Sequence, residues 1–504
     1  MELEQILRAP VYDVAKYTPL DPAPMLSKRL GVEVWLKRED LQPIFSFKIR
    51  GAYAKLASLT PEERKRGVIA ASAGNHAQGV AYGARHLGIK SLIVMPSTTP
   101  AIKVEAVEAL GAKVVLKGDT YDEAQIYATD LAKKKNCVYI HPFDDPHVIA
   151  GQGTVGMEIL RQQQNIDTIF VPVGGGGLIA GIVAYVSRVA PHIKIIGVEP
   201  EDAATLHDSL KAARRVVLDW VGIFADGVAV KQIGKHPFDV VRNHVHEVIL
   251  VKTDEICAAI KDVFGDTRVV AEPSGAIAIA GLKKYIAAGG AGTRHVAIVS
   301  GANTNFDRLR HVAERAELGE NREALLAVTI PERPGSFRRF CRELGKSAMI
   351  TEFNYRYADA TKARVFCGVK TASTADRTGV AARLIRAGYE VTDLSDNEMA
   401  KLHIRYMVGG RGVGIGKEVL VRVQFPERPG ALIAFLETVG KRWNISMFHY
   451  RNHGAAYGRV LAGFQIGDGE RKELFKALDS IGYRYWDETD NTAYDLFLSD
   501  PTER

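Results

Sequence analysis

Short apolar runs alternate with amphipathic segments from about residue 67 to residue 303 of the 504-residue chain. The runs are rich in Val and Ile and end at Gly, Pro or Ser, as buried strands do, and the segments between them have the length of helices. This alternation predicts an α/β domain in which helices cover both faces of a mostly parallel sheet, with ligands bound at the carboxyl ends of the strands. The strand-like runs are GVIAAS, SLIVMP, KVVLKG, VYIHPF, TIFVPV, IKIIGVEP, EVILVK and HVAIVSG.

The pattern changes beyond about residue 318, where one segment of the chain occurs twice. The sequence PERPG at Pro331–Gly335 recurs at Pro426–Gly430, and the same alignment places Tyr355 opposite Tyr450. Each copy has the order strand, turn, helix, two strands, helix and strand, which predicts a ferredoxin-like α+β fold. One small domain has therefore been duplicated.

Three domains are expected from these patterns. The first covers residues 1–318 and includes a smaller subdomain at roughly residues 40–147, and the two copies cover residues 324–407 and 417–504. The segments Glu317–Ala324 and Val408–Gly416 have the polar or glycine-rich composition of linkers between domains.

Composition and charge narrow the function classes. A hydrophobic fraction of 46% and a charged fraction of 25% are typical of a soluble globular protein, and no apolar run or leader-like start suggests a membrane, so a cytoplasmic protein is expected. The four cysteines have long, irregular spacings that indicate neither a zinc site nor a disulfide framework. The net charge of +7 is spread over helical faces, which argues against a nucleic-acid partner and suits small anions.

Lys48 lies in the segment SFKIRGAY, where Ser46 is expected to cap a helix and Lys48 to occupy its first turn. A free lysine titrates near pH 10.4, so a neutral amine at pH 7 requires a pKa depression of about three units, roughly 4 kcal/mol. The helix dipole is too weak for this, and burial or a Schiff base would have to supply most of it. Taken alone, the segment leaves a solvated lysine as the alternative.

Two further segments follow strands. Asn75, in ASAGNHAQG, could cap the next helix or point its amide at the strand ends. Four glycines, 174–177, join a strand to an apolar helix that begins near Leu178, and their backbone N–H groups with the helix N-terminus predict a phosphate site, a flexible linker being the alternative.

The same glycines support a rival interpretation. Gly175, Gly177 and Ala180 fit G-x-G-x-x-A, and Glu199 at the end of the next strand could bind a ribose, as in a dinucleotide site. That reading gives Lys48 no role. Ser300 ends the last strand, either as a site residue or as an ordinary turn residue, and Glu272 lies beside a helix start that is expected to be capped.

Taken in order, SFKIRGAY, SAGNHAQG, VGGGGL, EPSGA and SGANTNF resemble the fold type II, tryptophan-synthase-like pyridoxal phosphate enzymes. With the duplicated C-terminal domain, which is ACT-like, the resemblance narrows to the biosynthetic threonine ammonia-lyases and covers the chain from Tyr17 to its end. It implies an α/β catalytic domain followed by a tandem of ferredoxin-like regulatory domains.

The resemblance also implies roles for individual residues. Lys48 would bind pyridoxal 5'-phosphate as a Schiff base and, once released by the substrate amine, remove the α-proton. Asn75 would hydrogen-bond the cofactor's 3-oxygen, and Ser300 would contact the pyridine nitrogen. The residues expected to hold the phosphate are Gly174, Gly175, Gly176, Gly177 and Leu178. Those expected to hold the substrate carboxylate are Ser72, Ala73, Gly74 and Asn75.

The implied reaction is β-elimination of L-threonine to 2-oxobutanoate and ammonia, the first committed step of isoleucine biosynthesis. A hydroxyl at the pyridine nitrogen makes the ring a weaker electron sink than a carboxylate would, which favours prompt elimination. Related serine racemases carry a second Ser where this chain has Ala73, so elimination should dominate over racemisation. Some serine deamination is expected, because one methyl group in an apolar pocket is worth only about 1 to 3 kcal/mol.

In this family isoleucine inhibits and valine opposes the inhibition, so Tyr355 and Tyr450 are candidate effector-site residues, with core tyrosines as the alternative. The family also suggests a homotetramer. No metal site is predicted, although a cation near Glu199 or Glu272 stays an open question. Two other functions remain open from the sequence, an NAD-type oxidoreductase and a non-catalytic amino-acid sensor.

Overall fold

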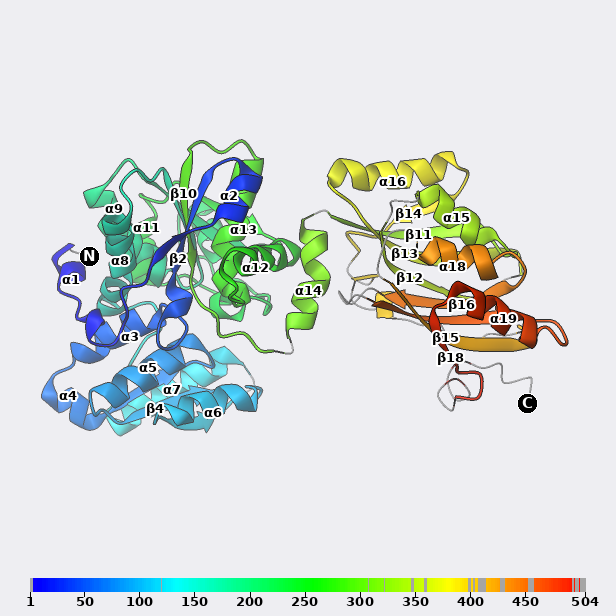
Figure 1. The fold of residues 1–504 in the computed structure, drawn as a ribbon. Coiled ribbons are helices and arrows are strands. Elements are labelled where there is room, and N and C mark those ends of the chain that lie inside the picture. Colours follow the sequence, from blue (N-terminus) through cyan, green and yellow to red (C-terminus); the bar gives the residue numbers. More distant parts are fainter. Residues whose placement is uncertain are drawn as a thin grey trace. The chain divides into compact units, whose positions relative to one another are not determined.

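The computed structural model describes residues 3–118, 120–306, 308–320, 322–345, 349–357, 360–397, 400–401, 404–406, 414–426, 431–451, 457–491, 494 and 498. Contacts divide the chain into two compact units, Met1–Gly319 and Glu320–Arg504 (Figure 1). Residues 427–430 of the second PERPG segment and residues 408–413 of the expected linker lie outside the described residues. No helix among the described residues is both long and apolar enough to cross a membrane.

A six-stranded sheet with the order β1-β2-β10-β7-β8-β9 forms the larger part of the first unit (Figure 1). All its pairings are parallel except that of β1 with β2. Side chains alternate between two cores: Ile169 and Val171 pack with α8 (Pro146–Gln162) and α9 (Gly177–Val189), and Phe170 packs with α12 (Thr253–Thr267) and α13 (Pro273–Ala287). The strands are β1 (Leu20–Pro22), β2 (Glu33–Arg38), β7 (Thr168–Pro172), β8 (Lys194–Pro200), β9 (Glu247–Val251) and β10 (Arg294–Val299).

A separate four-stranded parallel sheet, β5-β4-β3-β6, makes up the rest of the first unit. Its strands are β3 (Val68–Ala71), β4 (Ser91–Met95), β5 (Lys113–Leu116) and β6 (Val138–Tyr139). Helices α3 (Lys48–Ala57), α5 (Asn75–His86) and α6 (Ala101–Ala109) contribute to the core on one face, and α7 (Tyr121–Lys135) covers the other. The expectation of a single sheet was therefore wrong, because periodicity identifies buried strands without showing which of them pair.

The second unit is an eight-stranded antiparallel sheet with the order β14-β11-β13-β12-β16-β17-β15-β18. Both copies have the predicted order of strand, helix, two strands, helix and strand, and β12 pairs with β16 to join them. The first copy comprises β11 (Glu323–Pro331), α15 (Ser336–Leu344), β12 (Ile350–Arg356), β13 (Lys362–Lys370), α16 (Thr374–Arg386) and β14 (Glu390–Asp393). The second comprises β15 (Glu418–Pro426), α18 (Ala431–Val439), β16 (Asn444–Arg451), β17 (Tyr457–Gln465), α19 (Arg471–Ile481) and β18 (Arg484–Asp487).

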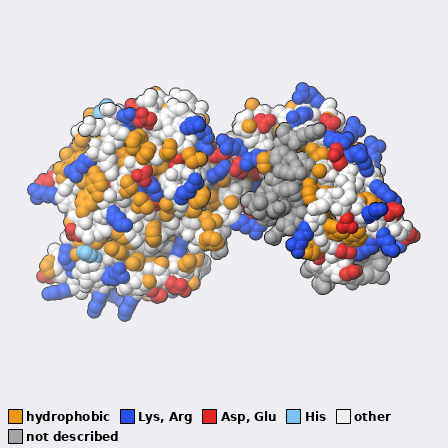
Figure 2. All heavy atoms as spheres, in the orientation of Figure 1, with side chains coloured by type: hydrophobic (Ala, Val, Ile, Leu, Met, Phe, Trp, Pro, Cys, Tyr) orange, Lys and Arg blue, Asp and Glu red, His pale blue; other side chains and the backbone are white. Residues whose placement is uncertain are grey.

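The expected linker at Glu317–Ala324 is shorter than predicted. Helix α14 (Arg308–Gly319) continues to Gly319 and β11 begins at Glu323, which leaves three residues between them. The last turn stays helical because Leu318 is buried and Lys261 pairs with Glu317 at 2.5 Å. Further helices of the first unit are α1 (Leu3–Leu7), α2 (Pro24–Leu30), α4 (Pro61–Arg66), α10 (Thr205–Lys211) and α11 (Lys235–Val241). Figure 2 shows its apolar side chains scattered among polar and charged ones.

Four fully buried charges connect β2, α3 and α8. The Arg50 guanidinium donates to both carboxylate oxygens of Glu39, at 2.7 and 2.8 Å, and of Glu158, at 2.6 and 3.0 Å. Lys37 Nζ completes the cluster with a 2.5 Å contact to Glu158. Burial alone would favour the protonated acid, but Arg50 and Lys37 lower the pKa of Glu39. Two positive and two negative charges therefore balance in the interior, and we call these residues the buried ionic cluster.

Glycines on α8 let two other helices approach closely. A Cβ at Gly151 would lie 2.6 Å from the carbonyl oxygen of Arg50 in α3, and a Cβ at Gly153 would lie 2.9 Å from the carbonyl oxygen of Gly181 in α9. Contacts this short exclude any side chain at either glycine. Helix α8 thus fixes the spacing between the helix that begins at Lys48 and the helix that follows the four glycines.

Replacing Arg50 by Met should destabilise the first unit by about 3 to 5 kcal/mol, because two buried carboxylates would then face Lys37 alone. The exposed pair of Arg8 and Glu4 provides the control, and Arg8→Met should cost less than about 1 kcal/mol. Calorimetric unfolding of both variants beside wild type measures the difference. Equal effects of the two substitutions would show that the buried ionic cluster stabilises the first unit no more than an exposed ion pair does.

Candidate active site

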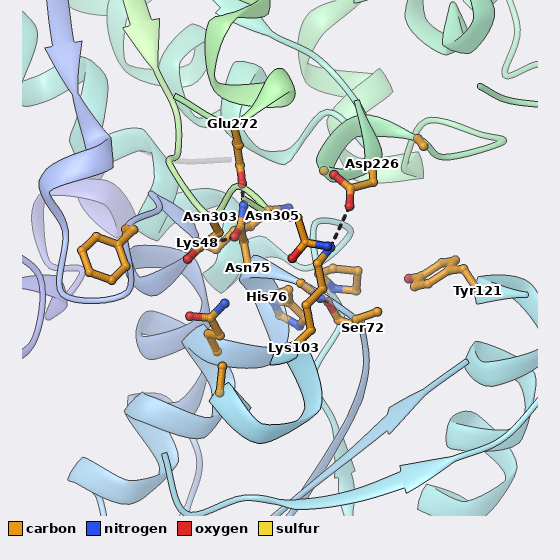
Figure 3. Close-up of a pocket in the computed structure, with 18 of the residues that line it drawn as sticks. Lys48, Ser72, Asn75, His76, Lys103, Tyr121, Asp226, Glu272, Asn303 and Asn305 are labelled. Atoms are coloured by element: carbon orange, nitrogen blue, oxygen red, sulfur yellow. Dashed lines mark hydrogen bonds and ion pairs between the residues drawn. The ribbon is translucent and has the colours of Figure 1, made fainter. Parts of the chain in front are cut away.

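A cavity of about 560 Å³ in the first unit contains Lys48 and lies between the small sheet and the carboxyl ends of the large one (Figure 3). It shares part of its wall with an inner pocket that reaches the glycine loop. The outer cavity is lined by residues that include Phe45, Lys48, Ser72, Ala73, Gly74, Asn75, Lys103, Tyr121, Asp226, Glu272 and Asn303. The inner pocket is lined by Lys48, Asn75, Gly174, Gly175, Gly176, Gly177, Leu178, Glu272, Ser274 and Ser300, among others. The predicted cofactor and substrate residues are thus brought together around Lys48.

Lys48 is the first residue of α3, as the sequence predicted, but Ser46 does not cap the helix. The N-cap residue is Phe47, without a side-chain cap, and Ser46 Oγ accepts only a long 3.4 Å hydrogen bond from the Lys48 backbone N–H. Ser46 instead forms a β-bridge with Gly301, which fixes the start of α3 to the end of β10. Burial lowers the pKa of Lys48 to about 8, opposed by the Glu272 carboxylate. Burial thus makes the neutral amine, which a nucleophile or base requires, more accessible than in a free lysine.

The Asn75 amide is held from two sides. Its Nδ2 donates to Glu272 Oε1 at 2.6 Å, and its Oδ1 accepts from Asn303 Nδ2 at 2.7 Å (Figure 3). Gly74 occupies the N-cap of α5, so the capping alternative for Asn75 was wrong. The amide points into the cavity instead, with its orientation set by its two partners.

Glu272 is 5% exposed and occupies the N-cap position of α13, with Pro273 as the first helical residue. Its carboxylate accepts from Asn75 and does not cap the helix, so the expected side-chain cap was wrong. Burial raises the pKa of Glu272 to about 7, with a further contribution from Asp226. Asp226 in turn accepts from Lys103 Nζ at 2.8 Å (Figure 3).

The glycine loop connects β7 to α9 and has little room for side chains. A Cβ at Gly175 would lie 2.2 Å from the Phe143 ring, and Gly176 has a φ of +87°, which favours glycine. The loop ends at the N-terminus of the thirteen-residue helix α9, where backbone N–H groups are unpaired within the helix. This is the geometry in which proteins bind phosphate.

Two serines complete the inner pocket. Ser300 follows β10 and donates its hydroxyl to the Ser274 carbonyl oxygen at 3.2 Å. Ser274 is 3% exposed, and its Oγ is shielded from solvent with no hydrogen-bond partner among the described residues. Because an unsatisfied buried hydroxyl costs free energy, a ligand that hydrogen-bonds Ser274 would be favoured here. The polar residues of the pocket therefore fit an oxygen-rich group such as a phosphorylated cofactor.

The predicted substrate turn lies between β3 and α5. Ser72 Oγ accepts from the Gly74 backbone N–H at 3.2 Å, while Ala73 and Gly74 line the outer cavity. A Cβ at Gly74 would meet no atom within 4 Å, so the space beside this turn is open. The turn can therefore present its backbone to a small ligand in the cavity.

Several lining residues were not identified from the sequence as site residues. Phe45 has a φ of +54°, rare for a residue with a side chain, and is 57% exposed while lining the cavity. Also not identified were three polar residues whose roles depend on the contacts described above, Asn303, Lys103 and Asp226. A strained aromatic residue three positions before Lys48 could not be identified, because positive φ is invisible when the residue is not glycine.

The dinucleotide interpretation fails at Glu199. This carboxylate is fully buried and accepts from the Thr205 hydroxyl at 3.0 Å and from the backbone N–H groups of Leu206 and His207 at 2.8 and 2.9 Å. All its hydrogen bonds are directed at the start of α10, so Glu199 is not available to a ribose. The described residues also contain no group of three or more acidic, His or Cys side chains that could hold a metal ion.

Comparison with known proteins agrees with this geometry. Residues 11–301 match the family described as pyridoxal-phosphate dependent enzyme, and residues 314–404 and 409–498 match the C-terminal regulatory domain of threonine dehydratase. The L-threonine dehydratase biosynthetic IlvA of Pasteurella multocida is 53% identical over 498 residues, covering 98% of this chain and 97% of that protein. The chain belongs to the threonine dehydratase family of pyridoxal-phosphate-dependent enzymes.

The chain is also similar to a eukaryotic threonine dehydratase and to solved structures of related enzymes. The mitochondrial threonine dehydratase of Saccharomyces cerevisiae is 51% identical, covering 98% of this chain and 88% of that protein. The solved structure of processed threonine deaminase isoform 2 from Solanum lycopersicum has a TM-score of 0.61 at 52% identity, covering 62% of this chain and 92% of that one. The solved structure of maize serine racemase has a TM-score of 0.58 at 31% identity, covering 62% of this chain and 96% of that one. As a member of the family, this protein is a pyridoxal-phosphate-dependent ammonia-lyase.

The raised pKa of Glu272 gives a test of the site's electrostatics. A carboxyl group whose pKa rises from 4.5 unfolded to about 7 folded favours the folded state most at low pH, and this contribution is lost as pH rises through 7. Glu272→Gln should therefore gain stability relative to wild type between pH 5 and pH 8, by up to about 3 kcal/mol. Calorimetric unfolding at both pH values measures this gain. The exposed Glu62→Gln control should show no such trend. A stability difference between Glu272→Gln and wild type that is the same at pH 5 and pH 8 would contradict the raised pKa of Glu272.

Proposed function

We propose that the protein converts L-threonine to 2-oxobutanoate and ammonia as the first committed step of isoleucine biosynthesis. The observation that carries this proposal is the convergence of Lys48, the fixed Asn75 amide, the glycine loop and Ser300 on the inner pocket. Lys48 would hold pyridoxal phosphate covalently, the loop its phosphate, Asn75 its 3-oxygen and Ser300 its pyridine nitrogen. When bound, the cofactor withdraws electrons from the substrate's α-carbon.

The residues around the cavity have different roles in the proposed reaction. Lys48, with its pKa lowered to about 8, removes the α-proton, and the β-hydroxyl gains a proton and leaves as water. A water molecule then hydrolyses the released product to 2-oxobutanoate and ammonia. The Ser72–Asn75 turn holds the substrate carboxylate on backbone N–H groups. Ala73 lines the cavity without a proton to donate, which supports elimination over racemisation. Serine should also be deaminated, more slowly, because it lacks only the methyl group.

Lys48→Ala should abolish the visible absorption of the purified protein and reduce 2-oxobutanoate formation from threonine by at least about a thousandfold. Lys55→Ala, later on the same helix, removes an equal charge and should keep both properties. A colourless wild type that binds NAD would support the oxidoreductase instead. A yellow wild type that forms no 2-oxobutanoate would leave only the amino-acid sensor.

We also propose that the second unit binds isoleucine, which inhibits, and valine, which opposes it. Tyr355 lies on β12 opposite Phe448, and Tyr450 lies on β16 opposite Phe353, so both tyrosines belong to the seam between the copies. The Tyr355 hydroxyl donates to Glu332, whose other carboxylate oxygen accepts from Asn444 in the second copy at 2.9 Å. An effector that disturbs Tyr355 would therefore act on both copies. We expect a homotetramer, as in the family.

Tyr355→Phe keeps the aromatic ring but removes the hydrogen bond to Glu332. It should weaken isoleucine inhibition at least about fivefold without changing the kcat measured in the absence of effector. Tyr485→Phe on β18, which removes a hydrogen bond to Asp479 on α19, is the matched control and should leave inhibition unchanged. Measuring activity against isoleucine concentration, with and without valine, compares the inhibition of wild type and both variants. Unaltered inhibition in Tyr355→Phe would remove this residue from the effector site.

A further inference from the structure

A second cavity, of about 750 Å³, lies in the first copy of the regulatory domain. It is formed at the end of β11, where Pro331 pairs with Lys362 of β13 and Thr329 pairs with Glu390 of β14. The PERPG turn and the first residues of α15 form another side, and the turn between α16 and β14 closes it. We call this space the PERPG cavity. Neither Tyr355 nor Tyr450 lines it.

The PERPG cavity is strongly cationic. Arg333, Arg338, Arg339 and Lys362 line it, against Glu390 as the acidic residue of its wall. The side chains of Arg333, Arg338 and Arg339 make no hydrogen bond or ion pair with any described residue, and Arg338 Nε is shielded from solvent. Other arginines of this unit are paired, such as Arg342 with Glu437 and Arg356 with Glu418. Figure 2 shows Lys and Arg side chains gathered along one edge of the unit.

Clustering the guanidinium groups of Arg333, Arg338 and Arg339 without an ion-pair partner among the described residues costs free energy, and the fold itself gives no reason for this arrangement. The internal duplication supports the same conclusion. The positions of Arg338 and Arg339 on α15 correspond to Ile433 and Ala434 on α18, and that of Lys362 corresponds to Tyr457 on β17. The second copy therefore builds the same helix and strand without these charges. Their presence in the first copy points to a ligand.

We propose that the PERPG cavity binds an oligoanion, a small molecule with at least two negative charges such as a phosphorylated metabolite or a polycarboxylate. Guanidinium groups pair with phosphate and carboxylate oxygens in forked geometry, and several can share one ligand. A free amino acid suits the cavity less well, because its ammonium group would face four cations and one acid. The site is thus separate from the amino-acid effector sites proposed above and would let a second class of metabolite act on the regulatory unit.

The test uses full-length enzyme with bound cofactor and titrates it calorimetrically with pyrophosphate and, separately, with citrate. Wild type should bind at least one of them saturably, and Arg338→Ile/Arg339→Ala, which installs the second copy's residues, should weaken binding at least about tenfold. Lys362→Tyr, a milder change of the same kind, should weaken it at least about threefold. The relative strength of the two probes distinguishes a phosphoryl ligand from a polycarboxylate.

Lys472→Ile/Lys476→Ala removes the same charge from the exposed face of α19 in the second copy and should change binding less than about twofold. Three results would overturn the proposal. The first is no saturable binding of either probe to wild type, and the second is an equal loss of affinity in the α15 and α19 variants, as for non-specific attraction. The third is competitive displacement of the probe by isoleucine, which would make the cavity an amino-acid site.

Discussion

The buried ionic cluster is the constraint on which the active site depends. Arg50 lies two residues after Lys48 and is fixed by four hydrogen bonds to Glu39 and Glu158, both fully buried. A charge in a low-dielectric interior has no alternative partner, so the first turn of α3 cannot rotate or slide without leaving charges unpaired. The position of the Lys48 backbone is therefore set by electrostatics in the core, away from the cavity that its side chain serves.

The buried ionic cluster also helps to position the other residues of the site. Helix α8 contributes Glu158 to the cluster and, through Gly151 and Gly153, holds α3 and α9 at backbone contact distance. The glycine loop therefore lies at a fixed distance from Lys48. Across the cavity, the hydrogen bonds of Asn75 with Glu272 and Asn303 join the small sheet's helix α5 to segments that flank the large sheet. A cofactor held by these elements would contact both sheets at once.

The sequence predicted what depends on local pattern and missed what depends on distant partners. Lys48, the glycine loop and Ser300 stand at strand ends or helix starts, and the duplicated fold follows from its repeat. Strand β2 was not identified because its short apolar run ends at Lys37 and Arg38. These two residues are buried beside acids that neutralise them, Glu158 of α8 for Lys37, and Asp40 and Asp21 for Arg38. Likewise, Ser46 is a residue type that often caps helices, but here it forms a β-bridge with Gly301.

Chemical rescue tests whether Lys48 is the base that removes the α-proton. Lys48→Ala, loaded with pyridoxal phosphate, would be assayed on threonine with a series of small primary amines, using threonine with hydrogen or deuterium at the α-carbon. If Lys48 is this base, added amines should restore 2-oxobutanoate formation in proportion to their basicity, with a primary deuterium isotope effect on the rescued rate. Rescue that is independent of amine basicity, or that shows no isotope effect, would contradict it.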